Sequence, residues 1–202
     1  MQKIESDDLH FLRKCPCPVW LIKSNIQTPY RSILAAVDVD DYYPEKELKS
    51  RHLQNIQILE MASSLALSES ADIHIVHVSQ IMGENVMERV YRIFPDDEVI
   101  AYAEEVKQKH KKILNILISE LGKETLDYLK PQIHVLKGMP REEIPRLAQK
   151  VNADILVMGT VARTGISGFF IGNTAENILM QVDCSILAIK PKEFMTPVTL
   201  EN

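Results

Sequence analysis

The glycine-rich stretch from Leu156 to Glu176 constrains the fold of this chain more than any other. It begins with a short apolar run after Asp154, which predicts a buried strand. It ends in a pattern typical of a helix start. Glycine lets backbone N–H groups approach an anion closely, and a helix N-terminus favours negative charge. A strand, a glycine-rich turn and a helix in this order indicate an α/β fold with a phosphate-binding type of loop. The glycines between the two elements are Gly159, Gly165, Gly168 and Gly172.

Composition and charge exclude several classes of protein. The chain has 202 residues, enough for one ordinary domain plus a remainder, and its 46% hydrophobic and 25% charged residues are typical of a soluble globular protein. A net charge of −5 disfavours nucleic acid as a partner. The apolar stretches are only of strand length, so we expect no contact with a membrane. Three cysteines do not form a disulfide framework, and the first residues lack an apolar signal region; we therefore expect a cytoplasmic protein.

Strand-like and helix-like patterns alternate along residues 30–192. Because right-handed crossovers join such elements, the alternation predicts a parallel, doubly wound, Rossmann-like sheet. Residues 40–49 are expected to form a polar loop, 79–97 a surface excursion and 193–202 a frayed polar tail. The expected strands are residues 32–37, 72–78, 131–136, 154–158 and 184–190; the expected helices are residues 51–67, 97–121, a segment starting at Pro140 and a segment after the glycine-rich loop.

Two predicted strands end in residues suited to ligand binding. Asp38 ends the first of them, and Gly159 ends the fourth. Ligands of doubly wound sheets bind beyond the carboxyl ends of the strands, where the strand order reverses. If these two strands are neighbours there, Asp38 and Gly159 face one cleft. We expect Asp40 and Asp41 to lie in a solvated loop.

The N-terminal segment contains a second copy of the last strand pattern. Cys17 to Lys23 aligns without gaps with Cys184 to Lys190, and both runs follow helix-like residues. Such an internal repeat indicates duplicated structure. We interpret residues 1–24 as the last helix and strand of an upstream domain like that of residues 30–192; two unrelated edge strands are the alternative. An isolated apolar strand invites pairing, so we expect it beside Ser185–Ile189, in the same chain or in a swapped partner.

Several short motifs, taken together and in order, resemble the universal stress protein family over about residues 30–192. The resemblance implies a five-stranded parallel sheet of order 3-2-1-4-5, the adenine nucleotide alpha hydrolase-like fold. It also implies a homodimer or domain pair formed through the last strand, and the N-terminal segment is similar to tandem-domain members. The motifs are Ile-Leu-Ala-Ala-Val-Asp38, Ile-Val-His-Val78, Val-Leu-Lys-Gly138, Ala153-Asp-Ile-Leu-Val-Met-Gly-Thr160, Arg163-Thr-Gly165, Gly172-Asn-Thr-Ala-Glu176 and Cys184-Ser-Ile-Leu-Ala-Ile-Lys-Pro191.

In ATP-binding members of that family the loop has the pattern Gly-x2-Gly-x9-Gly-Ser/Thr. Here the four positions are Gly159, Ala162, Gly172 and Asn173. The Ala162 methyl would stand where a phosphate oxygen must come, and Asn173 lacks the compact hydroxyl but remains a good helix N-cap. We expect the loop to keep its fold and to bind phosphate weakly. The resemblance, with Arg163 added as a residue that could reach a phosphate, gives these candidate ligand-binding residues: Asp38, Val78, Met158, Gly159, Ala162, Arg163, Gly172, Asn173 and Thr174.

Other chemistry-bearing residues have simpler explanations. His74 and His77 are three apart on a strand and point to opposite faces, so we expect packing roles and no metal site. Cys15 and Cys17 alternate with prolines and have no second Cys or His pair near them, which favours a structural role over a redox or zinc site. No spacing suggests a nucleophile with its base, so no catalytic residue is assigned.

These patterns lead to two functional hypotheses. The first is a stress-response protein that binds a small ligand and pairs with another domain, with a degenerate nucleotide loop and little or no catalysis. The second is an ATP-binding switch or slow ATPase in which Asp38, Gly159 and Gly172 hold ATP. ATP is the only cofactor that either hypothesis names.

Overall fold

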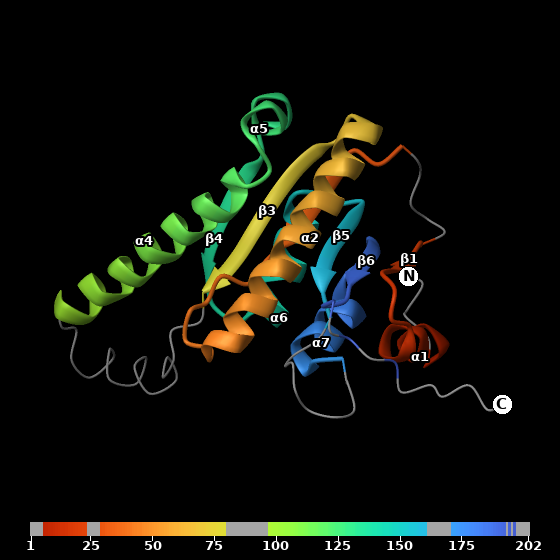
Figure 1. The fold of residues 1–202 in the computed structure, drawn as a ribbon, viewed down its shortest axis with the longest axis horizontal. Helices are drawn as coiled ribbons and strands as arrows, with labels where there is room; N and C mark the ends of the chain where they lie inside the picture. Colours follow the sequence, from red (N-terminus) through yellow and green to blue (C-terminus); the bar gives the residue numbers. More distant parts are fainter. Residues whose placement is uncertain are drawn as a thin grey trace.

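A six-stranded, mostly parallel sheet organises the molecule (Figure 1). The computed structural model describes residues 6–23, 29–79, 97–160, 171–192, 194 and 196. The strand order is β1-β6-β5-β2-β3-β4, which within residues 30–192 is the predicted order 3-2-1-4-5. The expected α/β class is therefore confirmed. The strands are β1 (Val19–Leu21), β2 (Ser32–Ala36), β3 (Asp72–Ser79), β4 (Gln132–Lys137), β5 (Ile155–Gly159) and β6 (Ser185–Ile189).

Helices cover both faces of the sheet, as Figure 1 shows for α2 and α6. Alternate residues of each central strand enter different cores, since successive side chains of a strand point to opposite faces. Leu34 of β2 packs in the core beneath α6 and α7, whereas Ile33 packs in the core beneath α2 and α4. The helices are α1 (Ser6–Lys14), α2 (Glu45–Glu69), α4 (Asp97–Ser119), α5 (Lys123–Leu129), α6 (Pro140–Lys150) and α7 (Asn173–Gln181). Within the described part of the chain, none of them is long and apolar enough to cross a membrane.

Sequence reasoning placed the start of one helix wrongly and missed another helix. Helix α2 begins at Glu45, inside the segment expected to be a polar loop. Its first turn is acidic and follows Pro44, a combination that suits a helix N-terminus, but the turn carries no apolar periodicity. Helix α5 was not predicted. It has only seven residues and no fully buried one, and Leu126 and Leu129, which pack partly buried against the core, are too few to give a clear helical period.

The N-terminal segment is part of the main body of the protein. Strand β1 pairs antiparallel with β6 in the same chain, which confirms the expected neighbour. Leu12 of α1 is fully buried in the core beneath α6 and α7. Lys23 Nζ donates to the Val182 carbonyl at 2.7 Å, and Arg13 binds Glu176 at 3.0 Å.

The register of this pairing relates the two copies of the repeated pattern. Trp20 lies opposite Leu187, and Leu187 is also its counterpart when Cys17 is aligned with Cys184. The flanking pairs obey the same symmetry. Val19, the counterpart of Ile186, faces Ala188, and Leu21, the counterpart of Ala188, faces Ile186. The two strands therefore meet with approximate two-fold symmetry centred on the Trp20–Leu187 pair.

The expected frayed tail was wrong at the two positions that the structure describes beyond Lys192. Phe194 is buried, and its ring centroid lies 4.9 Å from Lys190 Nζ. The Thr196 hydroxyl donates to the Lys14 carbonyl at 2.7 Å, which fastens this part of the tail to α1.

Candidate functional site

The strand order reverses between β2 and β5, and a cleft of about 390 Å³ opens at their carboxyl ends. The two strands are parallel neighbours, with Ala36 opposite Met158. Asp38 and Gly159 therefore face one cleft, as predicted. Ala162 and Arg163 lie outside the described residues. The other predicted site residues all line the cleft: Asp38, Val78, Met158, Gly159, Gly172, Asn173 and Thr174.

Asp38 is held by a dense set of hydrogen bonds at the end of β2. Its Oδ2 accepts from Arg51 Nη1 at 2.5 Å and from the Tyr43 hydroxyl at 3.2 Å. Its Oδ1 accepts the Asp40 backbone N–H at 3.1 Å. The Asn55 side chain bonds to both backbone groups of Asp38, which fixes the strand end against α2. The carboxylate is thus oriented before any ligand arrives.

Two opposing effects act on the pKa of Asp38. Burial raises this pKa, and the positive charge of Arg51 opposes the rise. Arg51 also binds Glu47 at 2.8 Å, and its guanidinium lies 3.6 Å from the centroid of the Tyr43 ring. Burial likewise raises the pKa of Tyr43, with the Asp38 charge adding to the effect. Arg51 therefore offsets part of the negative charge on one wall of the cleft, a role that sequence reasoning missed.

Gly159 makes room for a side chain of α2. A methyl group at Gly159 would lie 2.8 Å from Gln54 Nε2. Gln54 uses that nitrogen to donate to the Ile189 carbonyl at 3.1 Å. The glycine at this motif position thus permits a hydrogen bond between α2 and the end of β6.

The start of α7 forms another wall of the cleft. Gly172, which has no side chain, is the N-cap residue and Asn173 is the first helical residue, so the expected Asn173 cap was wrong. The Gly172 N–H donates to the Thr160 carbonyl at 3.0 Å, which fixes the chain as it enters α7. The first N–H groups of a helix have no intrahelical acceptor and attract anions.

Apolar side chains form the rest of the wall near β3 and β5. Val78 and Met158 are the next-to-last residues of these strands and are each 5% exposed. Ile144 of α6, with Ala175 and Ile178 of α7, lies beside them. An apolar surface next to a few fixed polar groups is the usual lining of a small-molecule site.

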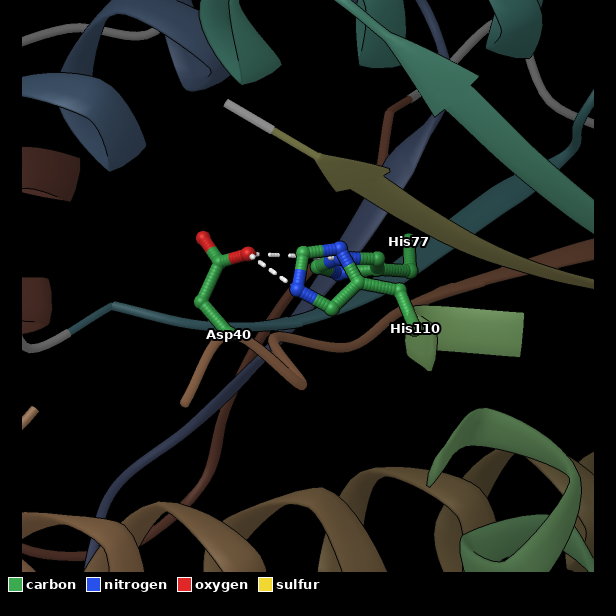
Figure 2. Close-up of side chains that lie close together, drawn as sticks. All are labelled: Asp40, His77 and His110. Atoms are coloured by element: carbon green, nitrogen blue, oxygen red, sulfur yellow. Dashed lines mark hydrogen bonds and ion pairs between the residues drawn. The ribbon is translucent and has the colours of Figure 1, made fainter. Parts of the chain in front are cut away.

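A second polar cluster borders the cleft, formed by Asp40, His77 and His110 (Figure 2). Asp40 was expected in a solvated loop, but it is only 6% exposed, so that expectation was wrong. Asp41 is exposed as predicted and binds Lys109. His110 lies on α4 at a position that sequence reasoning did not single out.

The prediction that His74 and His77 point to opposite faces is confirmed. His74 Nδ1 lies 3.1 Å from His134 Nε2 of β4, whereas His77 contacts His110 of α4. Cys15 is partly exposed and Cys17 is exposed; both are free thiols.

A parallel sheet of this order with a cleft at its reversal point defines the adenine nucleotide alpha hydrolase-like class of α/β proteins. A family model described as the universal stress protein family matches residues 29–190. The chain therefore belongs to the universal stress protein family.

Individual relatives agree with this assignment. Universal stress protein E of Escherichia coli K12 is 32% identical over 195 residues, which cover 96% of this chain and 58% of the relative. Its homolog in Haemophilus influenzae is 29% identical and covers 92% of this chain and 56% of the relative. The crystal structure of a functionally unknown protein from Pseudomonas aeruginosa PAO1 superposes with a TM-score of 0.69 at 28% identity, over 95% of this chain and 58% of that one. The present chain thus spans little more than half the length of these relatives.

Proposed function

We propose that this chain is a stress-response protein that binds an adenine nucleotide, or a ligand of similar chemistry, in the cleft between β2 and β5. The observation that carries the proposal is the convergence of Asp38, Met158 and Gly172 at the reversal point of the sheet. The apolar residues at the ends of β3 and β5 suit a planar base. The Asp38 carboxylate, with its side chain 38% exposed, can accept a hydrogen bond from a ligand hydroxyl.

The outer phosphates of the proposed ligand should add little to its binding affinity. Of the four positions of the nucleotide motif, Ala162 and Asn173 depart from the ATP-binding pattern. The Gly172 N–H already donates to the Thr160 carbonyl, so the start of α7 has one N–H group fewer to offer a phosphate. We therefore expect AMP and ATP to bind with similar affinity.

Catalysis is proposed to be weak or absent. Asp38 already accepts hydrogen bonds from Arg51 and Tyr43, so it is a poor base for activating a water molecule. An ATP-binding switch or slow ATPase remains the alternative, and it is favoured by Gly159 and Gly172 at the spacing of the motif.

Calorimetric titration with adenosine, AMP and Mg·ATP tests the proposal. Similar affinities for AMP and Mg·ATP, weakened by Asp38→Asn and unchanged by Asp41→Asn, would support it. Mg·ATP binding more than about tenfold tighter than AMP, a difference of about 1.4 kcal/mol, would favour the alternative. The double change Ala162→Gly plus Asn173→Ser should create such a preference. No binding of any of the three compounds would contradict both functions.

We also infer that residues 1–24 are the last helix and strand of a preceding family domain, that residues 30–192 form one complete domain and that residues 193–202 are its tail. The symmetric register of Trp20 and Leu187 supports this division, because equivalent strands of two domains would pair in this way. Strand β1 then supplies within the chain the pairing that the last strand would otherwise offer to a second copy. A cytoplasmic location belongs to the same proposal.

A further inference from the structure

Three buried side chains from three separate elements converge beside the cleft. Asp40 follows β2, His77 lies in β3 and His110 lies in α4; their exposed fractions are 6%, 1% and 4% (Figure 2). One potential ligand atom from each lies within 4.8 Å of those from the other two. Carboxylate oxygen and imidazole nitrogen are both ligands of divalent transition metals. We propose that Asp40, His77 and His110 form a binding site for such an ion, with Zn²⁺ as the best match.

The separations between these atoms favour a shared ion over direct hydrogen bonds. Asp40 Oδ1 lies 3.5 Å from His77 Nε2 and 3.6 Å from His110 Nε2. Both separations exceed the roughly 2.7–3.2 Å of an ordinary hydrogen bond. Tetrahedral Zn²⁺ with bonds of about 2.0–2.1 Å holds neighbouring ligand atoms about 3.3 Å apart. The two spacings between the carboxylate oxygen and the imidazole nitrogens are therefore already close to those of a metal-bound site.

Asp40 provides an independent sign that this place takes a ligand. Its Oδ1 is buried and has no hydrogen-bond partner among the residues that the structure describes. A buried carboxylate oxygen in this condition costs free energy, which a bound cation would recover. The oxygen points at both imidazole rings (Figure 2).

The remaining ring nitrogens face acceptors that can orient the imidazoles. His110 Nδ1 lies 2.9 Å from the Ser79 hydroxyl oxygen, and His77 Nδ1 lies 3.4 Å from the Val37 carbonyl oxygen. A metal-binding histidine commonly donates its other N–H to such an acceptor.

Metal binding should also change a tautomer. The Val39 N–H lies 3.4 Å from His77 Nδ1 and favours the form of His77 with its proton on Nε2. With Nε2 bound to a metal, the proton must lie on Nδ1 and point to the Val37 carbonyl. Asp40 and His77 both line the cleft, so a fourth coordination position would open toward it. The site does not depend on the ligand proposed for that cleft.

The test uses the whole chain, freed of metal with EDTA and titrated with Zn²⁺ against a chromogenic chelator. We expect one equivalent to bind, with an affinity reduced about 100-fold or more in Asp40→Asn and in His110→Gln. The matched controls are Asp41→Asn, on the same loop, and His74→Gln, on the same strand. A Cys15→Ser plus Cys17→Ser variant excludes a thiol site. All three controls should retain the affinity of the unchanged chain.

Spectroscopy tests the site even if a variant fails to fold. Nitrogen NMR of the unchanged chain should show His77 and His110 bound through Nε2 when Zn²⁺ is added, with the His77 proton moved to Nδ1. Co²⁺ should give the visible absorption bands of a tetrahedral site. The proposal is overturned if the metal-free chain takes up no stoichiometric Zn²⁺. Uptake that leaves both imidazole spectra unchanged would overturn it too, and so would equal uptake by folded Asp40→Asn.

Discussion

Arg51 Nη1 lies 2.5 Å from Asp38 Oδ2, so the carboxylate that ends β2 already has a cationic partner. The same guanidinium binds Glu47 and covers the ring of Tyr43. A ligand that contacts Asp38 must therefore share this carboxylate with Arg51 or displace it. The four groups act as one polar unit at the edge of the cleft.

Arg51→Met should raise the pKa of Asp38 further, because burial continues to raise it and the opposing cation is gone. A group whose folded pKa is raised contributes stability at low pH and loses it as the pH rises through that value. The stability that Arg51→Met loses relative to the unchanged chain should therefore grow as the pH rises above 3.8, the ordinary pKa of an aspartate. At neutral pH we expect a loss of about 1–3 kcal/mol, between the values for exposed and buried pairs.

Carbon NMR titration of the Asp38 carboxyl and urea unfolding at several pH values measure both effects. Lys49→Met is the matched control, because Lys49 forms an exposed pair with Glu45 on the same helix. It should change stability by less than about 0.5 kcal/mol. An Asp38 titration curve that is identical with and without Arg51 would contradict the prediction.

Gly159→Ala should cost about 1 kcal/mol, the usual value of one hydrogen bond. The new methyl would force Gln54 away from the Ile189 carbonyl. In a Gln54→Ala background the same substitution should be nearly neutral, so a double-mutant cycle should give a coupling of similar size. Gly122→Ala is the control. Gly122 has a φ of 83° with no atom near its Cβ position, so its cost is backbone strain that Gln54→Ala cannot relieve. Additive losses at Gly159 and Gln54 would show that this contact carries no energy.

Lys190 should make the free energy of unfolding depend on pH in the alkaline range. Its Nζ donates to the Leu12 carbonyl, the residue is 5% exposed, and burial lowers its pKa from 10.5 to about 8. Between these values the unfolded chain binds more protons than the folded one, so stability gains a contribution as the pH rises from 8 to 10.5. Lys190→Met removes this contribution.

Urea unfolding across that interval should show the unchanged chain gaining stability relative to Lys190→Met. Cys184 acts in the opposite direction, because burial raises its pKa to about 11, but it is present in both proteins and cancels in the difference. A constant difference between the two proteins from pH 8 to pH 10.5 would refute the assignment.

Removal of residues 1–24 should cause self-association, because it uncovers the edge of β6. Analytical ultracentrifugation over a range of concentrations measures this. Leu12→Ala is the informative comparison: it leaves β1 in place and creates a cavity at a fully buried position. We expect that variant to lose about 2–5 kcal/mol and to keep the oligomeric state of the unchanged chain. A truncated chain that sediments like the unchanged one would count against an edge-covering role for β1.

Sequence reasoning worked where one physical signal dominates. The uniformly apolar runs of β2, β5 and β6 are buried on both faces, and they predicted a parallel sheet correctly. The strand order was implied by the family resemblance and is also confirmed. Sequence reasoning failed where tertiary contacts determine the burial or the role of a residue. The burial of Asp40 depends on His77 and His110, which lie far from it in the sequence. The role of Arg51 was hidden in the same way, because its contact with Asp38 joins α2 to the end of β2 and leaves no pattern in the sequence.

The pairing of Trp20 with Leu187 also fixes how a second domain would be placed. A two-fold axis between antiparallel strands of one sheet stands perpendicular to that sheet and reverses the strand direction. Any domain that continued the sheet through β1 would therefore have the carboxyl ends of its parallel strands at the opposite edge of the sheet from those of β2 and β5. Two ligands in such an assembly would bind at opposite edges of the shared sheet. Any communication between them would have to pass through the shared sheet.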